Sequence, residues 1–245
     1  ILMAFTNTLP YPNNPITPAG ASTGRGPVNC PGYASVSLKS MLPSITTRTN
    51  SGSAIVRNIA GHKWELSISY NPLTRAQFEP LHGFLLQKKG ATSHFFVSLP
   101  QYTAPQDSTF STFVNSNDFA PSADVAAGVD NFKIVKSGYN NNGTNGRPSV
   151  GDIFSITDTN DTNHKKVYMI TRVETTADQT LGSLGATELR IHFTPPLQKS
   201  VESTTSTIKF KDVQFRVINK KKDIGYSLDV NNLYKLSLSL EEAQP

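Results

Sequence analysis

Two short patterns in the sequence have the residue types of a catalytic or an ion-binding site. Residues 20–24 (Gly-Ala-Ser-Thr-Gly) match the G-x-S-x-G turn that holds the nucleophilic serine of many hydrolases. That turn works only between a buried strand and a helix, whereas this segment is rich in proline. Residues 158–163 begin like a calcium loop, but Asn163 replaces the required glycine and Met169 the bidentate glutamate. We therefore predict neither a hydrolase nor a calcium loop.

The remaining residues that could do chemistry lack the spacing of a site. The histidines show no metal-ligand spacing, and the chain contains no phosphate loop or dinucleotide fingerprint. Several aromatic residues could stack on bases, but their alternation within strands predicts core positions instead. The histidines are His62, His82, His94, His164 and His192, and the aromatic residues are Trp64, Tyr70, Phe95, Phe96 and Phe215. We predict no catalytic, cofactor-binding or metal-binding residue, no cofactor, and no enzymatic activity.

The composition is typical of a mainly β protein with long polar loops. Only 17% of the 245 residues are charged, 37% are hydrophobic, and the net charge is +5. The short lysine runs 88–89, 165–166 and 220–222 suit an acidic protein surface or a phosphate backbone, but a solvated β face is the simplest interpretation. Cys30 is the only cysteine, so no disulfide forms within this sequence. No apolar run reaches membrane length, and residues 1–5 do not form a signal peptide, which predicts a soluble protein of a reducing compartment.

Residues 1–33 are predicted to form an extended arm. Prolines and glycines alternate through it, which excludes a helix and removes hydrogen-bond donors. Such a segment cannot bury its own surface, so it either stays disordered or lies along a neighbour. If the arm is ordered, we expect a partner subunit to be the reason.

Residues 34–105 are predicted to form the first part of a β domain. Period-two alternation indicates strands at 34–39, 64–70 and 94–99, and a further strand at 48–59 is interrupted by the turn signal 50–52.

A single helix is predicted at about 74–89, between the strands at 64–70 and 94–99. Thr74 and Gln77 have the spacing of a capping box, and Gly90 is placed for a C-cap. The residues at helical spacing are Phe78, Leu81, Phe84 and Leu85. Pro80 predicts a kink or a late helix start.

Residues 106–200 differ in pattern and are predicted to form an inserted small antiparallel β-barrel or sandwich. Short strands at 131–136, 152–157, 166–173 and 188–193 are separated by polar loop tips at 140–143 and 158–161. Residues 201–245 return to the alternating strand pattern of residues 34–105. Strands at 208–218, with a β-bulge near Asp212, and at 234–240 are predicted to complete the first sheet.

The order of these segments resembles tail structural proteins of long-tailed bacteriophages, in particular distal-tail and baseplate proteins with a tail-tube-like fold. The resemblance covers most of residues 34–242 and is one of layout. It is carried by RTNSG, HKWELSISY, PLTRAQFEPLHGFLLQKKGATSHFFVSLP, VGDIFSI, HKKVYMITRV, LRIHFTPPL, IKFKDVQFRVI and YKLSLSLEEA.

The resemblance implies a tail-tube-like β-sandwich flanked by one α-helix, and a closed ring of typically about six copies. The partners it implies are further copies of the chain, tail-tube and baseplate proteins, and DNA that passes through the lumen without being read. The location it implies is the virion, assembled in the host cytoplasm. A polar lumen would be compatible with Lys209, Lys211 and Gln214 beside Phe210 and Phe215.

Two other functions stay open at this point. A nucleic-acid-binding β module would use lysines 220–222, Lys209 and Lys211 on phosphates, and would bind single strands with a steep salt dependence. A carbohydrate-binding tail appendage would need an exposed aromatic platform in the inserted domain, where Tyr139 and Tyr168 are the only tyrosines.

Overall fold

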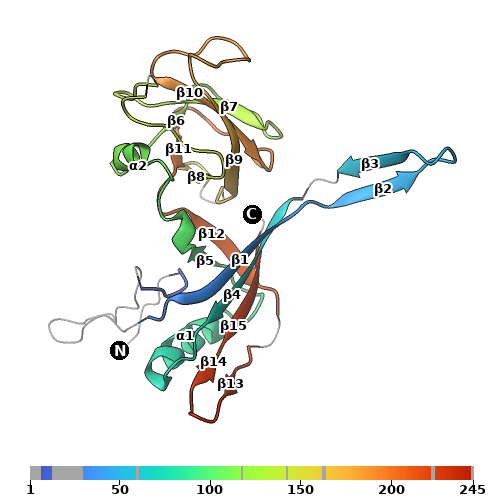
Figure 1. The fold of residues 1–245 in the computed structure, drawn as a ribbon, viewed down its shortest axis with the longest axis vertical. Helices are drawn as coiled ribbons and strands as arrows, with labels where there is room; N and C mark the ends of the chain where they lie inside the picture. The colour runs from blue at the N-terminus through green and yellow to red at the C-terminus, as the bar shows by residue number, and fades with distance from the viewer. Residues whose placement is uncertain are drawn as a thin grey trace. The chain divides into compact units, whose positions relative to one another are not determined.

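A computed structural model describes residues 7–12, 30–58, 61–116, 118–141, 143–161, 164–221 and 224–243. The chain divides into two compact units, which are residues 1–97 with 216–244, and residues 98–215 (Figure 1). The prediction of a mainly β fold is confirmed. The elements of the first unit are β1 (Tyr33–Met41), β2 (Ser44–Arg48), β3 (Ala54–Asn58), β4 (Lys63–Tyr70), α1 (Arg75–Gln87), β5 (Phe95–Ser98), β12 (Gln214–Asn219), β13 (Ser227–Leu228), β14 (Tyr234–Lys235) and β15 (Ser237–Glu242).

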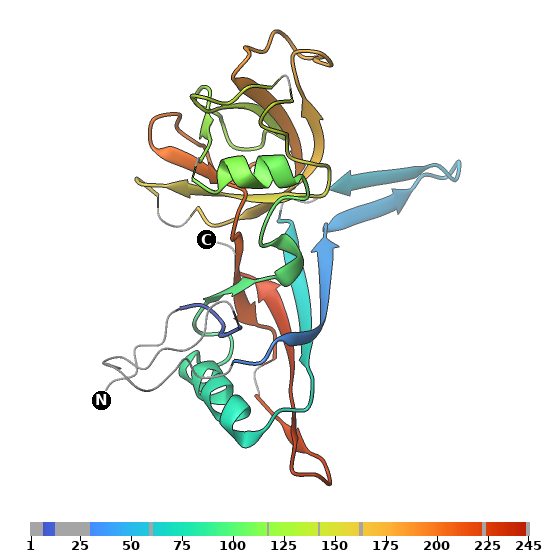
Figure 2. The same ribbon diagram turned by 60° about the vertical axis from the view of Figure 1, so that its left-hand side comes forward.

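The first unit is built on one five-stranded sheet with the order β1-β4-β15-β12-β5. β4 pairs antiparallel with β1 and β15, so segments from the two ends of the chain lie side by side, as the sequence predicts (Figure 2). Alternate residues of β4 and β15 are buried, including Leu66, Ile68, Leu238 and Leu240. The apolar stripe of α1 joins this core, with the rings of Phe84 and Phe95 5.5 Å apart.

Helix α1 begins where its capping box predicts. The N–H of Thr74 donates to Oε1 of Gln77 at 3.1 Å, which satisfies a donor at the helix start. The helix ends at Gln87 rather than 89, because Lys89 and Gly90 both adopt positive φ and close the C-terminus. Pro80 lies inside the helix, so the predicted late start is wrong.

The strand predicted at 48–59 is instead half of a separate hairpin. β2 and β3 pair antiparallel from Ser44↔Asn58 to Arg48↔Ala54. The turn lies where its signal predicts, with Thr49 N–H donating to Ser53 O at 3.0 Å. The predicted interruption is confirmed, whereas the predicted start at 48 is wrong, because β2 precedes the turn and pairs with β3.

The second unit is a nearly closed antiparallel barrel. Its elements are the 3-10 helix η1 (Pro100–Tyr102), α2 (Ser108–Val114), β6 (Ala120–Pro121), β7 (Asn131–Val135), β8 (Ile153–Asp158), β9 (Val167–Glu174), β10 (Glu188–Thr194) and β11 (Ser206–Lys209). The sheet order is β11-β8-β9-β10-β7-β6, and a bridge between Phe119 and Ile208 joins the two ends. The interior is strongly aromatic, with Phe154, Phe193, Phe210 and Tyr168 among its buried members.

Helix α2 is not predicted by the sequence. It caps the aromatic core through Phe110, whose ring lies 5.2 Å from that of Phe210. Its sequence, Ser-Thr-Phe-Ser-Thr-Phe-Val, consists of residues that disfavour helix, so it depends on packing and on its cap at Asp107. No helix within the described ranges is long and apolar enough to cross a membrane.

The strand predicted at 208–218 is two strands in two different sheets. β11 pairs with β8 in the barrel, whereas β12 pairs with β15 in the first unit. Between them Asp212 adopts a φ of 51°, and its N–H donates to Thr103 O at 3.0 Å. The irregularity near Asp212 is therefore a change of sheet and not a β-bulge. Accordingly, the second unit covers 98–215, beyond the predicted insertion at 106–200.

Asp107 joins the start of α2 to the loop around Gly146. Its Oδ1 accepts from the N–H of Thr109 at 2.8 Å and of Phe110 at 3.1 Å, and its Oδ2 accepts from Arg147 N–H at 3.2 Å. These hydrogen bonds, that from Phe110 first, lower the pKa of Asp107 below its ordinary value. Gly146, at a φ of 65°, passes so close that an added Cβ would lie 2.6 Å from Phe110 N.

Gly146→Ala is therefore expected to destabilise the second unit by about 2 kcal/mol, from left-handed strain plus a collision with fixed backbone. Gly138→Ala is the matched control, since Gly138 also has positive φ (81°) but no atom within 4 Å of an added Cβ. It should cost only about 1 kcal/mol. Urea unfolding of the two variants measures the difference, and equal losses would show that the Asp107 contact does not constrain Gly146.

Candidate interaction surfaces

The motifs that resembled chemical sites are structural where the structure describes them. Residues 20–24 lie outside the described residues, as do 162–163. Asp158 accepts hydrogen bonds from Asn160 N–H and Ser206 Oγ, both at 2.8 Å. Asp161 pairs with Lys199 at 2.6 Å, so the tip at 158–161 is tied to the neighbouring segment. Within the described ranges no cluster of three His, Cys, Asp or Glu residues could hold a metal ion.

The five histidines are dispersed, and each packs against its own local partner. His164 is buried beside Tyr168, with Nε2 and the hydroxyl 3.1 Å apart, and burial lowers its pKa to about 4. The others are His62 with Ser40, His82 with Phe78, His94 with Arg216 and His192 with Glu174. The five partners differ, and within the described ranges these histidines belong to no cluster that could hold a metal ion.

The aromatic residues singled out for nucleic acid are buried or partly buried, whereas the described lysines remain at the surface, three of them beside polar neighbours. Trp64, Tyr70, Phe95 and Phe215 are buried, and Phe96 is partly buried. Lys220 pairs with Glu65 at 2.6 Å and Lys209 approaches Asp118 at 3.9 Å, while Lys211 bonds to Asn115. Lys222 lies outside the described residues.

The polar lumen compatible with Lys209, Lys211 and Gln214 does not form as one strand face. Lys209 ends β11 in the second unit, and Gln214 begins β12 in the sheet of the first. The change of sheet at Asp212 separates them. In the second unit Tyr139 and Tyr168 are 2% and 0% exposed, so neither can serve as a carbohydrate platform.

The β2–β3 hairpin is exposed at every described side chain of its two strands. Both figures of the whole chain show it extending beyond the end of the sheet that contains β1 and β4 (Figures 1 and 2). Ile45, Ile55 and Val56 are 56%, 57% and 59% exposed, although β-branched apolar residues are normally buried in strands. Ile45 and Ile55 lie on one face of the ribbon and Val56 on the other, as the register Thr47↔Ile55 and Thr46↔Val56 requires.

Basic side chains accompany these apolar ones. Arg57 lies opposite Ile45, and Arg48 lies opposite Ala54 near the turn. Both arginines are exposed. The hairpin therefore presents an apolar and positively charged surface on a projecting ribbon, which is suited to insertion against another protein surface.

On the solvent-facing side of the five-stranded sheet, serines occupy exposed positions of β1, β4 and β15. Ser35, Ser69 and Ser237 form one row across β1, β4 and β15, and Ser37, Ser67 and Ser239 form the next. Ser35 and Ser69 share a hydrogen bond of 2.7 Å. The side chains of these two rows are uncharged, but Lys221 lines the same shallow hollow. The adjacent row contains Lys39, Glu65 and Glu241.

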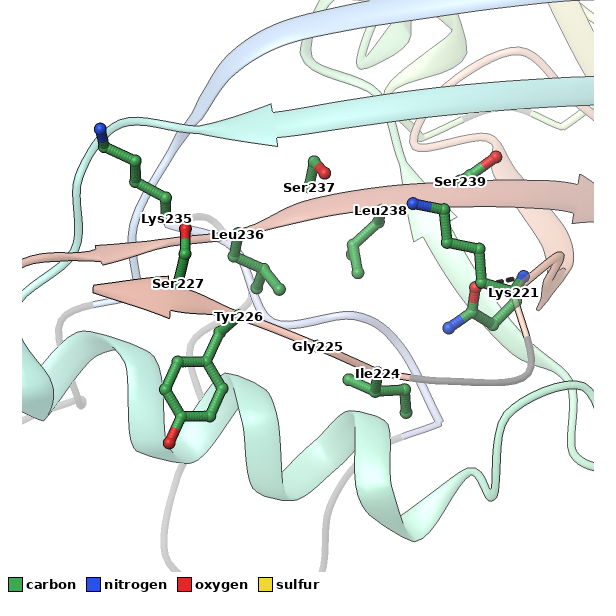
Figure 3. Close-up of a pocket in the computed structure, with 11 residues that line it drawn as sticks. Lys221, Ile224, Gly225, Tyr226, Ser227, Lys235, Leu236, Ser237, Leu238 and Ser239 are labelled. Atoms are coloured by element: carbon green, nitrogen blue, oxygen red, sulfur yellow. Dashed lines mark hydrogen bonds between the residues drawn. The ribbon is translucent and has the colours of Figure 1, made fainter. Parts of the chain in front are cut away.

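A groove of about 310 Å³ lies beside the first half of β15, next to residues 224–227. Lys221 and Lys235 lie at its two ends, with Ile224, Leu236 and Leu238 between them (Figure 3). Among the described residues that line it none is acidic. Tyr226 turns away onto α1, where its ring lies 4.9 Å from that of Phe78.

No protein-family model and no curated protein matches the chain. Sequence reasoning missed the hairpin surface because β2 and β3 have no apolar periodicity that distinguishes exposed from buried residues. The serine rows had a signal, since serines occupy the alternate positions of three predicted strands.

The strongest charge cluster of the second unit surrounds Glu174 at the end of β9. Its side chain is fully enclosed and accepts from Thr180 Oγ1 at 2.6 Å, from His192 at 3.2 Å and from Arg172 at 3.1 Å. Arg190 lies 3.8 Å away. The Thr180 hydrogen bond is the main cause that lowers the pKa of Glu174 to about 2. The hydroxyl of Thr180 and the two arginines stabilise the charged form of this carboxylate, so the cluster fixes the loop that follows β9 rather than activating a reactive group.

Proposed function

We propose that the chain is a non-enzymatic structural subunit that assembles with copies of itself into a closed ring, as in a bacteriophage tail at the junction of tube and baseplate or distal tail. The observation that carries the proposal is the β2–β3 hairpin, with three β-branched apolar side chains exposed on both faces. The resemblance of the sequence layout to distal-tail and baseplate proteins supports a bacteriophage tail as the place of this ring.

An isolated two-stranded hairpin is at best marginally stable in water. The ten residues of β2 and β3 gain little from their own burial, because the described side chains of both strands are exposed. Contact with a neighbouring copy would bury Ile45, Ile55 and Val56 and would stabilise the ribbon. Exposed apolar surface of this kind marks protein interaction sites in soluble proteins.

The open edge of the five-stranded sheet also supports assembly with further copies. β1 is nine residues long and is the terminal strand of its sheet, which leaves one side without a partner strand in the described structure. A long open edge is a hazard that a closed ring removes. In such a ring the neutral serine rows would line the channel, where small uncharged hydroxyl groups would let DNA pass without tight binding. The second unit would dock other tail components.

The competing function is a nucleic-acid-binding module, and it makes a different prediction. In our proposal the protein binds single-stranded DNA weakly, because the aromatic side chains that would stack on bases are buried, namely Trp64, Tyr70, Phe95 and Phe215. Fluorescence anisotropy with labelled single strands at low and physiological salt measures this affinity. Tight binding with a steep salt dependence would contradict the proposal and favour the competing function.

Sedimentation velocity over a wide range of protein concentration tests the assembly itself. We expect a single large species to grow at the expense of the monomer as concentration rises, because closed rings form cooperatively. A monomer at every concentration, with and without tail components as template, would reject the proposed function.

A further inference from the structure

The segment Asn7–Tyr11 covers the outer edge of β5 as a short parallel strand. Leu9 N–H donates to Phe96 O at 2.7 Å, and Phe96 N–H donates to Asn7 O at 2.8 Å. Leu9 is 0% exposed, and Tyr11 is also buried. β5 is the last strand in the order of its sheet, so this segment provides the hydrogen bonds that a neighbouring strand would otherwise make.

Side chains of the sheet and of α1 hold both ends of the segment. Lys88 Nζ donates to Asn7 Oδ1 at 2.6 Å and lies 5.0 Å from the centre of the Phe84 ring. At the other end Tyr11 stacks on Tyr33 at 6.5 Å between ring centres. These contacts explain why this part of the predicted arm is ordered without a partner subunit.

The β5 edge is the more apolar of the two edges of the sheet. β5 has the sequence Phe-Phe-Val-Ser, which combines high β propensity with no charge and no proline. β1, at the other edge, contains Lys39 and serines at alternate positions, which makes it the more polar edge. An uncharged edge strand rich in aromatic and β-branched residues is a template for pairing with another chain, unless a further segment covers it.

We propose that Asn7–Tyr11 is an edge cap, which prevents the β5 edges of two copies from pairing with each other. The excluded occupant is a second copy, because every copy carries the same edge and two such edges can pair antiparallel about a twofold axis. The inference does not depend on the proposed ring, since the cap acts wherever two copies meet. In a ring it would leave the contacts to surfaces other than β5, such as the β2–β3 hairpin.

Leu9→Pro removes the cap, because proline has no N–H for Phe96 O and does not fill the position of the leucine side chain. Thr8→Pro is the matched control. In a parallel ladder alternate residues bond to the partner strand, so the N–H of Thr8 points away from β5 and both hydrogen bonds remain.

Both variants are made in the full chain carrying Ile45→Ser, Ile55→Ser and Val56→Ser, so that contacts of the hairpin do not contribute. Hydrogen exchange measures the protection of the Phe96 amide, whose N–H is bonded to the cap. Sedimentation velocity measures association, and circular dichroism measures the fold.

Leu9→Pro is expected to speed exchange at Phe96 about tenfold, which corresponds to the loss of one hydrogen bond. It should also form dimers or larger species at concentrations at which Thr8→Pro does not. Adding Phe96→Lys to Leu9→Pro should suppress these species, because a lysine on the uncovered edge places like charges together across two paired β5 strands.

Association of Leu9→Pro that Phe96→Lys suppresses supports the cap. No association of Leu9→Pro, whether or not exchange at Phe96 becomes faster, would overturn it, as would association that Phe96→Lys leaves unchanged. If Leu9→Pro does not fold, Leu9→Ala is judged by the same criteria, since it keeps the backbone donor and shortens the buried side chain. Failure of the proposed ring would appear instead as a monomeric unmodified protein, whatever these variants do.

Discussion

Replacing Ile45, Ile55 and Val56 together by serine is expected to weaken self-association by at least a hundredfold (about 3 kcal/mol) while both units stay folded. Each side chain is more than half exposed, so each would contribute about 1 kcal/mol when buried against a neighbour. The monomer should lose little, because surface substitutions normally change stability by less than about 0.5 kcal/mol. Sedimentation velocity measures the association, and circular dichroism with thermal unfolding measures the fold.

Val230→Ser is the matched control for this variant. Val230 is 98% exposed in the other hairpin of the first unit, between β13 and β14, so it presents a similar apolar side chain away from β2 and β3. It should assemble as the unmodified protein does. Assembly of the triple variant at unchanged concentration would show that the hairpin is not a subunit contact.

Glu174→Gln is expected to cost the second unit about 3 kcal/mol. The carboxylate is fully enclosed, and its loss leaves Arg190, whose side chain is only 9% exposed, without its counter-charge. The value lies at the low end for a buried ion pair because Arg172 keeps half of its side chain in water. The exposed variant Glu202→Gln is the control and should change stability by less than about 0.5 kcal/mol.

The same cluster makes the unmodified protein sensitive to acid. The pKa of Glu174 is about 2 in the folded protein against an ordinary 4.5, so its stabilisation is present above pH 4.5 and is lost as the pH falls toward 2. His164 acts in the same direction from a higher pH, because its folded pKa of about 4 lies below the ordinary 6.5. Urea unfolding at a series of pH values should show the Glu174→Gln difference shrink below pH 4.5. A constant difference would contradict the charge argument.

Local signals predicted the elements that depend on local chemistry. The Thr74–Gln77 capping box and the apolar spacing of Phe78, Leu81 and Leu85 located α1 to within two residues. Strict alternation located β4, because one face of its sheet is buried. Both segments have patterns that do not depend on distant partners.

The missed features depend on tertiary partners that one sequence does not specify. Helix α2 needs the aromatic core and the bonds between Asp107 and the Gly146 loop, since its own residues disfavour helix. In the sequence, the change of sheet at Asp212 looks the same as a bulge. β11 and β12 each alternate normally, and only the strands with which they pair differ. Exposure of the hairpin could not be predicted, since Ile45, Ile55 and Val56 are residue types that strands usually bury.

The most direct test of self-assembly is the mass of the purified protein by size-exclusion chromatography with light scattering, with negative-stain images of the same fraction. The proposal predicts a closed particle of several copies, about six by resemblance, with a central hole. A protein that stays monomeric at every concentration, with and without tail components present, would contradict it.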